Sequence, residues 1–297
     1  INIAPLLAGS EGTLAVLRKI TIRLMPKPRK TMLGVLTYPS IVEACEAVPD
    51  LLERHPSAVE LIPGDLIRLA RAIPAYASQL TFVTGDPEAM LVVEFSGEDE
   101  ATLRTKVEAL SPTVTIAATA AQQAQVWSVR KVGLGLFNSL PGDAKALSFI
   151  EDTAIPVDKL GLFVREVERI LKGYGTRANI YAHASAGCLH IRPLLNIKDA
   201  GGVAVMRDIA NEVMTLAISL GGATSGEHGD GLVRSQFLKQ SYGDQVYQLF
   251  GDLKRAFDPQ NILNPGNMMG DPRLEQNLRY GNGYKPVGWE PYLDFSV

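Results

Sequence analysis

The chain has 297 residues, of which 46% are hydrophobic and 21% charged, and its formal net charge is -3. This is the composition of an ordinary globular protein and excludes disorder over most of the length. The chain lacks the excess of basic residues that binding to nucleic acid would need, and its apolar runs are all shorter than the roughly 18 residues of a membrane span.

The only two cysteines, Cys45 and Cys188, lie far apart and form no CxxC motif. We therefore expect no disulfide framework and a reducing, cytoplasmic compartment. The chain begins at Ile1, without an initiator methionine and without the charged and apolar regions of a signal peptide. We interpret the chain as a fragment that begins in the middle of a strand-rich region.

The first half of the chain mixes strands and helices. Residues 14–25 end in an apolar and polar alternation that predicts a half-buried strand. The Pro-Lys-Pro segment that follows indicates a domain crossing, because proline has no N–H for strand pairing. Further strands are expected at 31–38, 59–62, 90–95 and 113–119, and helices at 40–54, 65–72 and 98–110, the first capped by Ser40.

The second half repeats this mixture of elements. Helices are expected at 120–135, 157–172, 200–219 and 236–256, and strands at 146–152, 178–184 and 188–194. Strands and helices joined by short turns and hairpins predict an α+β fold, a mainly antiparallel sheet with helices packed on one face. The final segment is rich in Gly, Pro and Tyr and is expected to wrap over the surface.

Three of the four histidines fall in two glycine-containing motifs. His183 and His190 lie in Tyr-Ala-His-Ala-Ser-Ala-Gly-Cys-Leu-His-Ile-Arg-Pro, which is typical of a hairpin with its tip at residues 186–187. This register places the two imidazoles directly opposite each other, with Cβ atoms about 5 Å apart, where they can bind one divalent ion. The same alternation predicts that the face is shared by Tyr181, Ser185, Cys188 and Arg192.

The second motif is Ser-Gly-Glu-His-Gly-Asp-Gly at residues 225–231. Glu227 together with His183 and His190 makes a plausible shell for Zn²⁺ or Mn²⁺, and His228 could act as a base beside the ion. Each histidine could equally be a hydrogen-bonded structural residue, and Asp230 either a turn residue or a partner of His228. From the residues alone, the chain carries a metal-assisted site of unknown reaction.

Four separated motifs together resemble a known family. Residues 8–14, Ala-Gly-Ser-Glu-Gly-Thr-Leu, are similar to the turn that closes the flavin-binding domain of FAD-linked oxidases of the vanillyl-alcohol oxidase type. The spacing His183-x6-His190, the Gly-Glu-His-Gly motif at 226–229 and Ile-Leu-Asn-Pro-Gly at 262–266 resemble the C-terminal half of these enzymes, in the same order. The likeness is greatest to the D-2-hydroxyglutarate and D-lactate dehydrogenase branch.

The resemblance implies a domain layout and the roles of several residues. It implies a ferredoxin-like substrate-binding cap domain at 28–235, remnants of the FAD-binding domain at 1–27 and 236–270, and an extended tail at 271–297. His183, His190 and Glu227 would bind a divalent metal, zinc or manganese, and His228 would take the proton of the substrate hydroxyl while hydride passes to FAD. The residues that would contact FAD are Gly9, Ser10, Glu11, Gly12, Thr13 and Asn264.

Three basic residues would bind the substrate. By resemblance, Arg130 pairs with the carboxylate of the hydroxy acid and Lys145 is a second cationic contact, although a surface ion pair and a solvated loop position are the structural alternatives. This chain departs from the branch at two positions, with Cys188 where Asn is usual and Arg192 where a small polar residue is common. We hypothesise that Arg192 binds the second carboxylate of a dicarboxylic hydroxy acid.

The resemblance also implies partners. A flavin-binding subdomain would precede Ile1, and the tail from Glu275 to Ser296 looks like the joint before an iron–sulfur module. The chain would then be the substrate and metal half of an enzyme that oxidises a D-2-hydroxy acid to a 2-oxo acid, inactive alone and without tightly held FAD. The metal, the exact substrate and the oligomeric state, a homo-oligomer included, stay open. Two rival functions are a zinc hydrolase that uses the same His-His-Glu site and a non-catalytic cap that docks a partner.

Overall fold

The computed structural model describes residues 2–270, 272–281, 283–285, 288 and 292–293. Its first large unit is a βαββαβ arrangement over residues 30–117. The strands are β1 (Lys30–Tyr38), β2 (Ala58–Pro63), β3 (Ala89–Gly97) and β4 (Thr115–Ala117). The helices are α2 (Ile41–Leu52), α3 (Gly64–Arg71), α4 (Pro74–Ala77) and α5 (Glu100–Glu108). The strand order β4-β1-β3-β2 with antiparallel pairing is that of a ferredoxin-like unit.

The second half of the chain extends the same sheet. β7 (Ala178–His183) pairs with β2, and β8 (Cys188–Leu195) pairs with β7. The short strands β5 (Lys145–Ala146) and β6 (Thr153–Ala154) both pair with β8. All pairs in this eight-stranded sheet, as far as the chain is described, are antiparallel, which confirms the predicted α+β fold.

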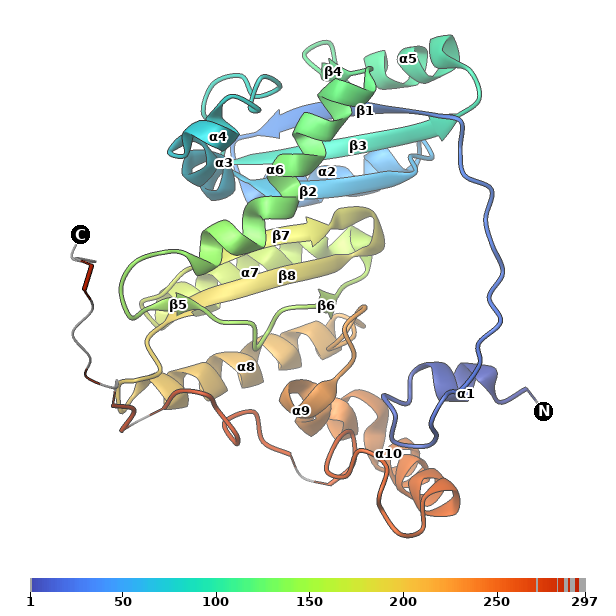
Figure 1. Ribbon diagram of the computed structural model, residues 1–297, viewed down its shortest axis with the longest axis vertical. Coiled ribbons are helices and arrows are strands. Elements are labelled where there is room, and N and C mark those ends of the chain that lie inside the picture. Colours follow the sequence, from blue (N-terminus) through green and yellow to red (C-terminus); the bar gives the residue numbers. More distant parts are fainter. Residues whose placement is uncertain (1, 271, 282, 286–287, 289–291, 294–297) are drawn as a thin grey trace.

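Apolar cores lie on both faces of the sheet. The larger core packs α2, α5, α7 (Leu160–Gly173) and α8 (Gly202–Ser219) on one face, as predicted. A second core lies on the opposite face under α3 and α6 (Ala120–Asn138), which crosses the strands in Figure 1. The helices therefore cover one face more fully and part of the other. Across the described chain, no helix is both long and apolar enough to cross a bilayer.

Local sequence signals explain where the main helices begin. The Ser40 side chain accepts a hydrogen bond from the Glu43 N–H and starts α2, as predicted. Thr119 and Gln122 form a capping box at the start of α6. α7 follows the 3-10 turn η1 (Val157–Lys159) and turns a row of apolar side chains, among them Phe163, into the larger core.

Two predicted strands are wrong. Residues 15–28 are extended but pair with no strand among the described residues, and their apolar side chains are exposed, because alternation alone supplies no partner. The segment 146–152 is not a continuous strand. Ala146 pairs with Leu194 and Thr153 pairs with Leu189, so the chain advances seven residues on this side while β8 advances only five. The two extra residues form a bulge that turns Glu151 and Asp152 out of regular pairing.

The N-terminal segment meets the segment that follows α8 beside the sheet. The N-terminal helix α1 (Ala4–Ala8) lies near α9 (Gly231–Arg234), the turn η3 (Ser235–Phe237) and α10 (Leu238–Phe257), at the lower right of Figure 1. The predicted helix at 236–256 is therefore confirmed as α10, which bends at Gly243. In the tail, Leu274 is buried in the larger core, and residues 294–296 of the predicted joint lie outside the described residues.

Candidate functional site

The two histidines of the hairpin share one face of the sheet but do not lie opposite each other. β7 and β8 pair His183 with Cys188 and Tyr181 with His190, two residues away from the predicted register. A shift by two residues keeps every side chain on its face. His183 and His190 are therefore diagonal neighbours whose ring centroids lie 5.2 Å apart. The predicted register is wrong, and the two imidazoles nevertheless meet.

The turn between the two strands explains the register. It contains the 3-10 segment η2 (Ala184–Ala186) and Gly187, whose φ of 70° lies in the left-handed region. A Cβ at Gly187 would lie 2.0 Å from the Ile155 carbonyl oxygen, so only glycine fits. Ser185 lies in this turn, and its Oγ accepts a hydrogen bond from the Val59 N–H. It braces the turn against β2 instead of joining the histidines as predicted.

Three imidazoles meet at Glu227. Its Oε1 lies 3.4 Å from His183 Nε2, 3.4 Å from His190 Nε2 and 3.3 Å from His228 Nε2. The side chain of His190 is only 4% exposed, whereas those of Glu227 and His228 are 44% and 42% exposed. The cluster of the three histidines and Glu227 is therefore buried where it lies on the sheet and exposed to solvent on the loop at 225–231.

Asp152 ties this loop to the sheet. Its carboxylate accepts hydrogen bonds from Ser225 Oγ at 2.5 Å, from the Glu227 N–H at 3.0 Å and from the His228 N–H at 2.9 Å. The residue is fully buried and has a φ of 75°. Burial raises the pKa of its carboxyl, but these hydrogen bonds outweigh burial and lower it. Asp230, in contrast, accepts from Thr224 Oγ1 and is a turn residue, not a partner of His228.

Two glutamates that no motif had indicated face the imidazoles. Glu60 Oε1 lies 2.6 Å from His183 Nδ1, and Glu151 Oε1 lies 3.0 Å from His228 Nδ1. The hydrogen bond to Glu60 raises the pKa of His183. Burial disfavours the charged form of Glu151, but hydrogen bonding and the nearby cationic groups outweigh it and lower the pKa of Glu151 to about 2.

The sequence held a signal for these carboxylates. Glu60 interrupts the apolar strand 58–63, and Glu151 and Asp152 directly follow the apolar pair Phe149 and Ile150. Charged residues inside an apolar run are seldom buried unless they are paired. The pattern therefore indicated paired buried charges, although it could not name the partners.

Cys188 lies beside the loop and is not ionised. Its Sγ is 3.4 Å from Asp152 Oδ1, and burial raises the pKa of the thiol to about 12. A Cβ at Gly226 would lie 2.9 Å from this sulfur, so the loop passes as close as glycine allows. Cys188 is thus a small packing residue next to the site.

The three basic residues predicted to bind substrate lie in different surroundings. The Arg130 guanidinium lies over the Tyr181 ring, 4.6 Å from its centroid, and its Nε donates to Glu60 Oε2 at 3.2 Å. With its side chain 16% exposed, Arg130 makes a mostly buried ion pair, not a surface one.

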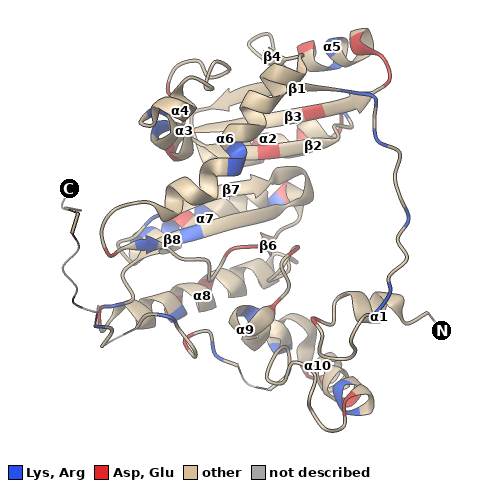
Figure 2. Cartoon of the chain, viewed as in Figure 1, with Lys and Arg blue, Asp and Glu red and all other residues tan. Residues whose placement is uncertain are grey.

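Arg192 also reaches the face that carries the histidines. It donates to Glu151 Oε2 at 2.7 Å, and its Nε is buried with no hydrogen-bond partner in the described part of the chain. Lys145 is exposed at the start of β5 and donates to the Leu140 carbonyl oxygen at 2.5 Å. Figure 2 shows the basic residues of α6 and β8 among acidic residues of the neighbouring strands and connections. The structure brings Arg130 and Arg192 to the cluster but not Lys145, which pairs with Leu195, five residues further along β8 than His190.

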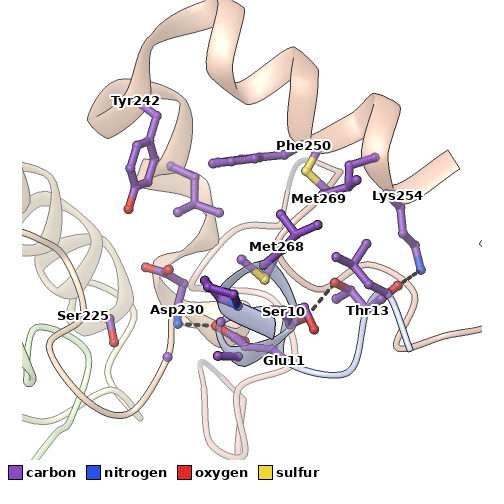
Figure 3. A pocket seen from close by; sticks show the side chains of 18 of the residues that line it. Ser10, Glu11, Thr13, Ser225, Asp230, Tyr242, Phe250, Lys254, Met268 and Met269 are labelled. Atoms are coloured by element: carbon purple, nitrogen blue, oxygen red, sulfur yellow. Dashed lines mark hydrogen bonds between the residues drawn. The ribbon is translucent and has the colours of Figure 1, made fainter. Parts of the chain in front are cut away.

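The N-terminal turn at 9–13 is fastened to the C-terminal segment by Glu11. The Glu11 carboxylate accepts hydrogen bonds from the N–H groups of Asp230 at 2.6 Å and Gly231 at 3.0 Å, and from Asn267 Nδ2 at 2.9 Å. Asn264 Nδ2 donates to the Glu11 carbonyl oxygen at 2.8 Å. Figure 3 shows Glu11 and Asp230 side by side. Glu11 and Asn264 thus hold together segments that are far apart in the sequence.

A pocket of about 570 Å³ opens between this turn, the loop at 225–230 and α10 (Figure 3). Tyr242 and Phe250 of α10 form part of its apolar wall, and Glu227 and His228 form part of its polar wall. Of the residues predicted to contact FAD, those that line the pocket are Gly9, Ser10, Glu11 and Thr13. The pocket therefore joins the predicted flavin-contact turn to the histidine cluster.

The chemistry of the donors fits a divalent cation at Glu227. His183, His190 and Glu227 each offer one ligand atom within 4.8 Å of the others, and two imidazoles with a carboxylate suit Zn²⁺ or Mn²⁺. Two neighbouring groups meet the same distance. They fit less well, because Arg192 already engages Glu151 in one, and a protonated thiol and the hydrogen-bonded Asp152 belong to the other.

The sequence matches a known protein family and several characterised enzymes. Residues 27–268 match the family described as FAD linked oxidases, C-terminal domain. A D-2-hydroxyglutarate dehydrogenase from Pseudomonas putida is 30% identical over 282 residues, which are 90% of this chain and 28% of that protein. A D-lactate dehydrogenase from Archaeoglobus fulgidus is 29% identical over 89% of this chain and 57% of that protein.

Solved structures agree on the fold. The crystal structure of p-cresol methylhydroxylase with substrate bound superposes with a TM-score of 0.58 at 18% identity, over 86% of this chain and 55% of that one. The chain spans less than a third of the D-2-hydroxyglutarate dehydrogenase and just over half of the D-lactate dehydrogenase.

Proposed function

The chain belongs to the C-terminal domain family of FAD-linked oxidases, and from this premise we propose that it forms the substrate- and metal-binding part of a D-2-hydroxy acid dehydrogenase. The reaction would convert a 2-hydroxyglutarate- or lactate-like acid to the 2-oxo acid. The observation that carries the proposal is the convergence of three imidazole Nε2 atoms on Glu227 Oε1, on the wall of a pocket that also carries the predicted flavin-contact turn.

In this proposal His183, His190 and Glu227 hold the divalent metal. When bound, the metal acts as a Lewis acid that orients the substrate hydroxyl and lowers its pKa. The two imidazoles come from the sheet, whereas Glu227 comes from the loop that Asp152 anchors. The position of the carboxylate relative to the imidazoles therefore depends on the buried Asp152.

His228 would remove the hydroxyl proton. Its Nδ1 faces Glu151 and its Nε2 faces the cluster, so the free lone pair for a proton lies on the pocket side. When bound, FAD supplies the acceptor for the hydride that leaves C2 of the substrate. Loss of this hydride and of the hydroxyl proton together yields the 2-oxo acid.

Arg130 and Arg192 would bind carboxylates. The terminal nitrogens of Arg130 form no hydrogen bond with the described residues, which leaves the planar edge of the guanidinium free for a bidentate contact. Arg192 keeps an Nε that is buried without a hydrogen-bond partner among the described residues, so its guanidinium has donors left for a carboxylate. Lys145, at the end of β8 away from the hairpin, would add positive charge only at long range.

The role of Arg192 sets an expected substrate preference. Arg192→Ala should reduce turnover of D-2-hydroxyglutarate at least tenfold more than turnover of D-lactate, because only the first substrate has a second carboxylate. Steady-state assays of the full-length flavoprotein on both acids measure this ratio. Equal losses on the two acids would remove Arg192 from the substrate site.

We also propose the remaining parts of the enzyme. The substrate-binding cap would span residues 28–235, and the return segment to the FAD-binding domain would end at 270. A flavin-binding subdomain and an iron–sulfur module would complete the enzyme, so that electrons pass from the substrate to FAD and on to the iron–sulfur centres. The D-2-hydroxyglutarate dehydrogenase relative is more than three times the length that matches this chain, which leaves room for such modules.

The decisive experiment is elemental analysis of the chain beside a His183→Ala/His190→Ala variant. We expect one equivalent of zinc or manganese in the wild type and its loss in the variant. His55→Asn is the matched control, because His55 is exposed and remote from the cluster, and asparagine tolerates its positive φ. Metal content that is unchanged in the double variant would overturn the ligand assignment. Flavin-independent hydrolysis that needs the metal would instead favour the hydrolase.

A further inference from the structure

Two buried glutamates occupy equivalent positions around the cluster. Glu60 lies opposite His183 in the β2–β7 pair and places Oε1 2.6 Å from His183 Nδ1. Its other oxygen, Oε2, accepts a hydrogen bond from Arg130 Nε at 3.2 Å. The side chains of Glu60 and Arg130 are 13% and 16% exposed, so this chain of contacts is largely shielded from water.

Glu151 repeats the arrangement on the other side of the cluster. Its Oε1 lies 3.0 Å from His228 Nδ1, and its Oε2 accepts a hydrogen bond from the Arg192 guanidinium at 2.7 Å. These two side chains are 10% and 11% exposed. Each glutamate therefore divides its two oxygens between one arginine and one imidazole.

The hydrogen-bonding chemistry of these contacts selects the histidine tautomers. A carboxylate can only accept, so the Nδ1 atom that faces it must carry the hydrogen, and in the neutral ring Nε2 then holds the lone pair. In His183 and His228 that lone pair faces Glu227. His190 has no such partner among the residues that the structure describes: its Nδ1 is buried without a hydrogen bond and lies 3.6 Å from Glu151 Oε2.

We propose that Glu60 and Glu151 are positioning residues, each holding one imidazole in the Nδ1–H form through a buried Arg–Glu–His chain. Glu60 prepares His183 as a metal ligand, and Glu151 prepares His228 as a base. The inference rests on the proposed function and adds two residues to it. It also joins each carboxylate-binding arginine to a particular histidine, Arg130 to His183 and Arg192 to His228.

Glutamine at either position breaks one of the two contacts. Its side-chain amide has a single acceptor oxygen, whereas the arginine and the imidazole both need an acceptor. Glu60→Gln should therefore mix the tautomers of His183, and Glu151→Gln those of His228. Glu94→Gln is the matched control: Glu94 lies on the neighbouring strand β3, opposite Ala58, and the nearby Glu60 carboxylate helps burial to raise its pKa, but it makes no hydrogen bond or ion pair with an imidazole or an arginine among the described residues.

Long-range ¹H–¹⁵N NMR of the histidine rings in the metal-free chain, at about pH 8.5 where free imidazole is neutral, reads the tautomers directly. We expect His183 and His228 in the Nδ1–H form in the wild type and in Glu94→Gln, and one of them changed in each glutamate variant. Nε2–H tautomers of both rings in the wild type, or tautomers unmoved by either variant, would overturn the proposal.

Titration of the same proteins with ZnCl₂ against a chromophoric chelator separates the two glutamates. Loss of a carboxylate behind a ligating histidine costs about 10–100-fold in metal affinity. Glu60→Gln should show that loss, and Glu151→Gln should stay within about threefold of the wild type because His228 is not a ligand. Equal affinity of Glu60→Gln and wild type would refute the role of Glu60. A wild type with the expected tautomers but no zinc binding would refute the metal site while leaving the tautomer assignment standing.

Discussion

The sheet and the junction between two end segments, residues 2–29 and 229–268, are held together by different forces. Residues 30–219 bury both faces of the sheet, with side chains such as Leu61, Phe95 and Phe163 almost fully excluded from water. These two end segments bury few apolar side chains, and two of those in the described chain, Val16 and Met25, are more than 80% exposed. What holds the ends is a small number of buried polar contacts centred on Glu11 and Lys254.

The sheet therefore supplies most of the stability of the fold, whereas the polar contacts fix where the end segments lie. Apolar burial grows with the area removed from water and stabilises the sheet without directional demands. Buried hydrogen bonds add little net stability but are costly to leave unmade, so they fix position. The candidate site lies at the border: His183 and His190 stand on the sheet, while Glu227 and His228 stand on a loop held by Asp152 on one side and by Glu11, through Asp230, on the other.

The largest expected effect belongs to the sheet. Phe163→Ala should lower the free energy of unfolding by about 3–5 kcal/mol, because it opens a cavity in the larger core. Leu162→Ala, one residue away on the exposed side of α7, should cost less than about 1 kcal/mol. Urea unfolding followed by circular dichroism measures both. Similar losses in the two variants would contradict the assignment of the core.

Lys254 offers a way to release the ends alone. Its buried ammonium donates to the Thr13 and Leu263 carbonyl oxygens and pairs with Asp258 at 2.5 Å. Lys254→Met should leave Asp258 without its counter-charge and cost about 3 kcal/mol, felt at the junction. Hydrogen exchange should rise around Thr13 and Leu263 and stay unchanged in β7 and β8. The exposed Lys239→Met is the control, and faster exchange throughout the sheet would show that the two regions unfold as one.

Acid should weaken the border between the regions. The folded-state pKa of Glu151 is lowered to about 2 from its ordinary value of 4.5, so its contribution is complete above about pH 4.5 and is lost as the pH falls toward 2. That contribution is about 3 kcal/mol. Urea unfolding of the metal-free chain at pH values on both sides of this window should show the loss, and Glu151→Gln should flatten it. A stability that does not change across the window would mean that Glu151 is not held as an ion pair.

The smallest effect is expected in the extended arm. Ile22→Ser replaces a side chain that is 71% exposed, and its cost should stay below about 0.5 kcal/mol. The same unfolding assay measures it. A loss above 1 kcal/mol would show that the arm has a packing partner and would weaken the contrast between the two regions.

Periodicity predicted most elements because it is a local property. The amphipathic pattern of α7 and the cap at Ser40 need only neighbouring residues, and both predictions are confirmed. The strand at 14–25 failed because alternation describes a surface and does not supply the partner strand. The strand at 146–152 failed because the bulge follows from the pairing with β8, which lies some forty residues further along the chain.

The motifs around His183, His190 and the 225–231 loop also indicated which residues would gather, since residue type limits what each can ligate. Their partners could not be predicted, because Glu60, Glu151 and Asp152 reach the cluster from β2 and the bulge only when the sheet is assembled. The sequence by itself thus determined the α+β fold class, the face that His183 and His190 share and the chemical identity of the donors. The tertiary structure alone decided the hairpin register, through the close contact at Gly187, and the convergence of three imidazoles on one carboxylate. Such convergence depends on distances between strands that no local pattern encodes.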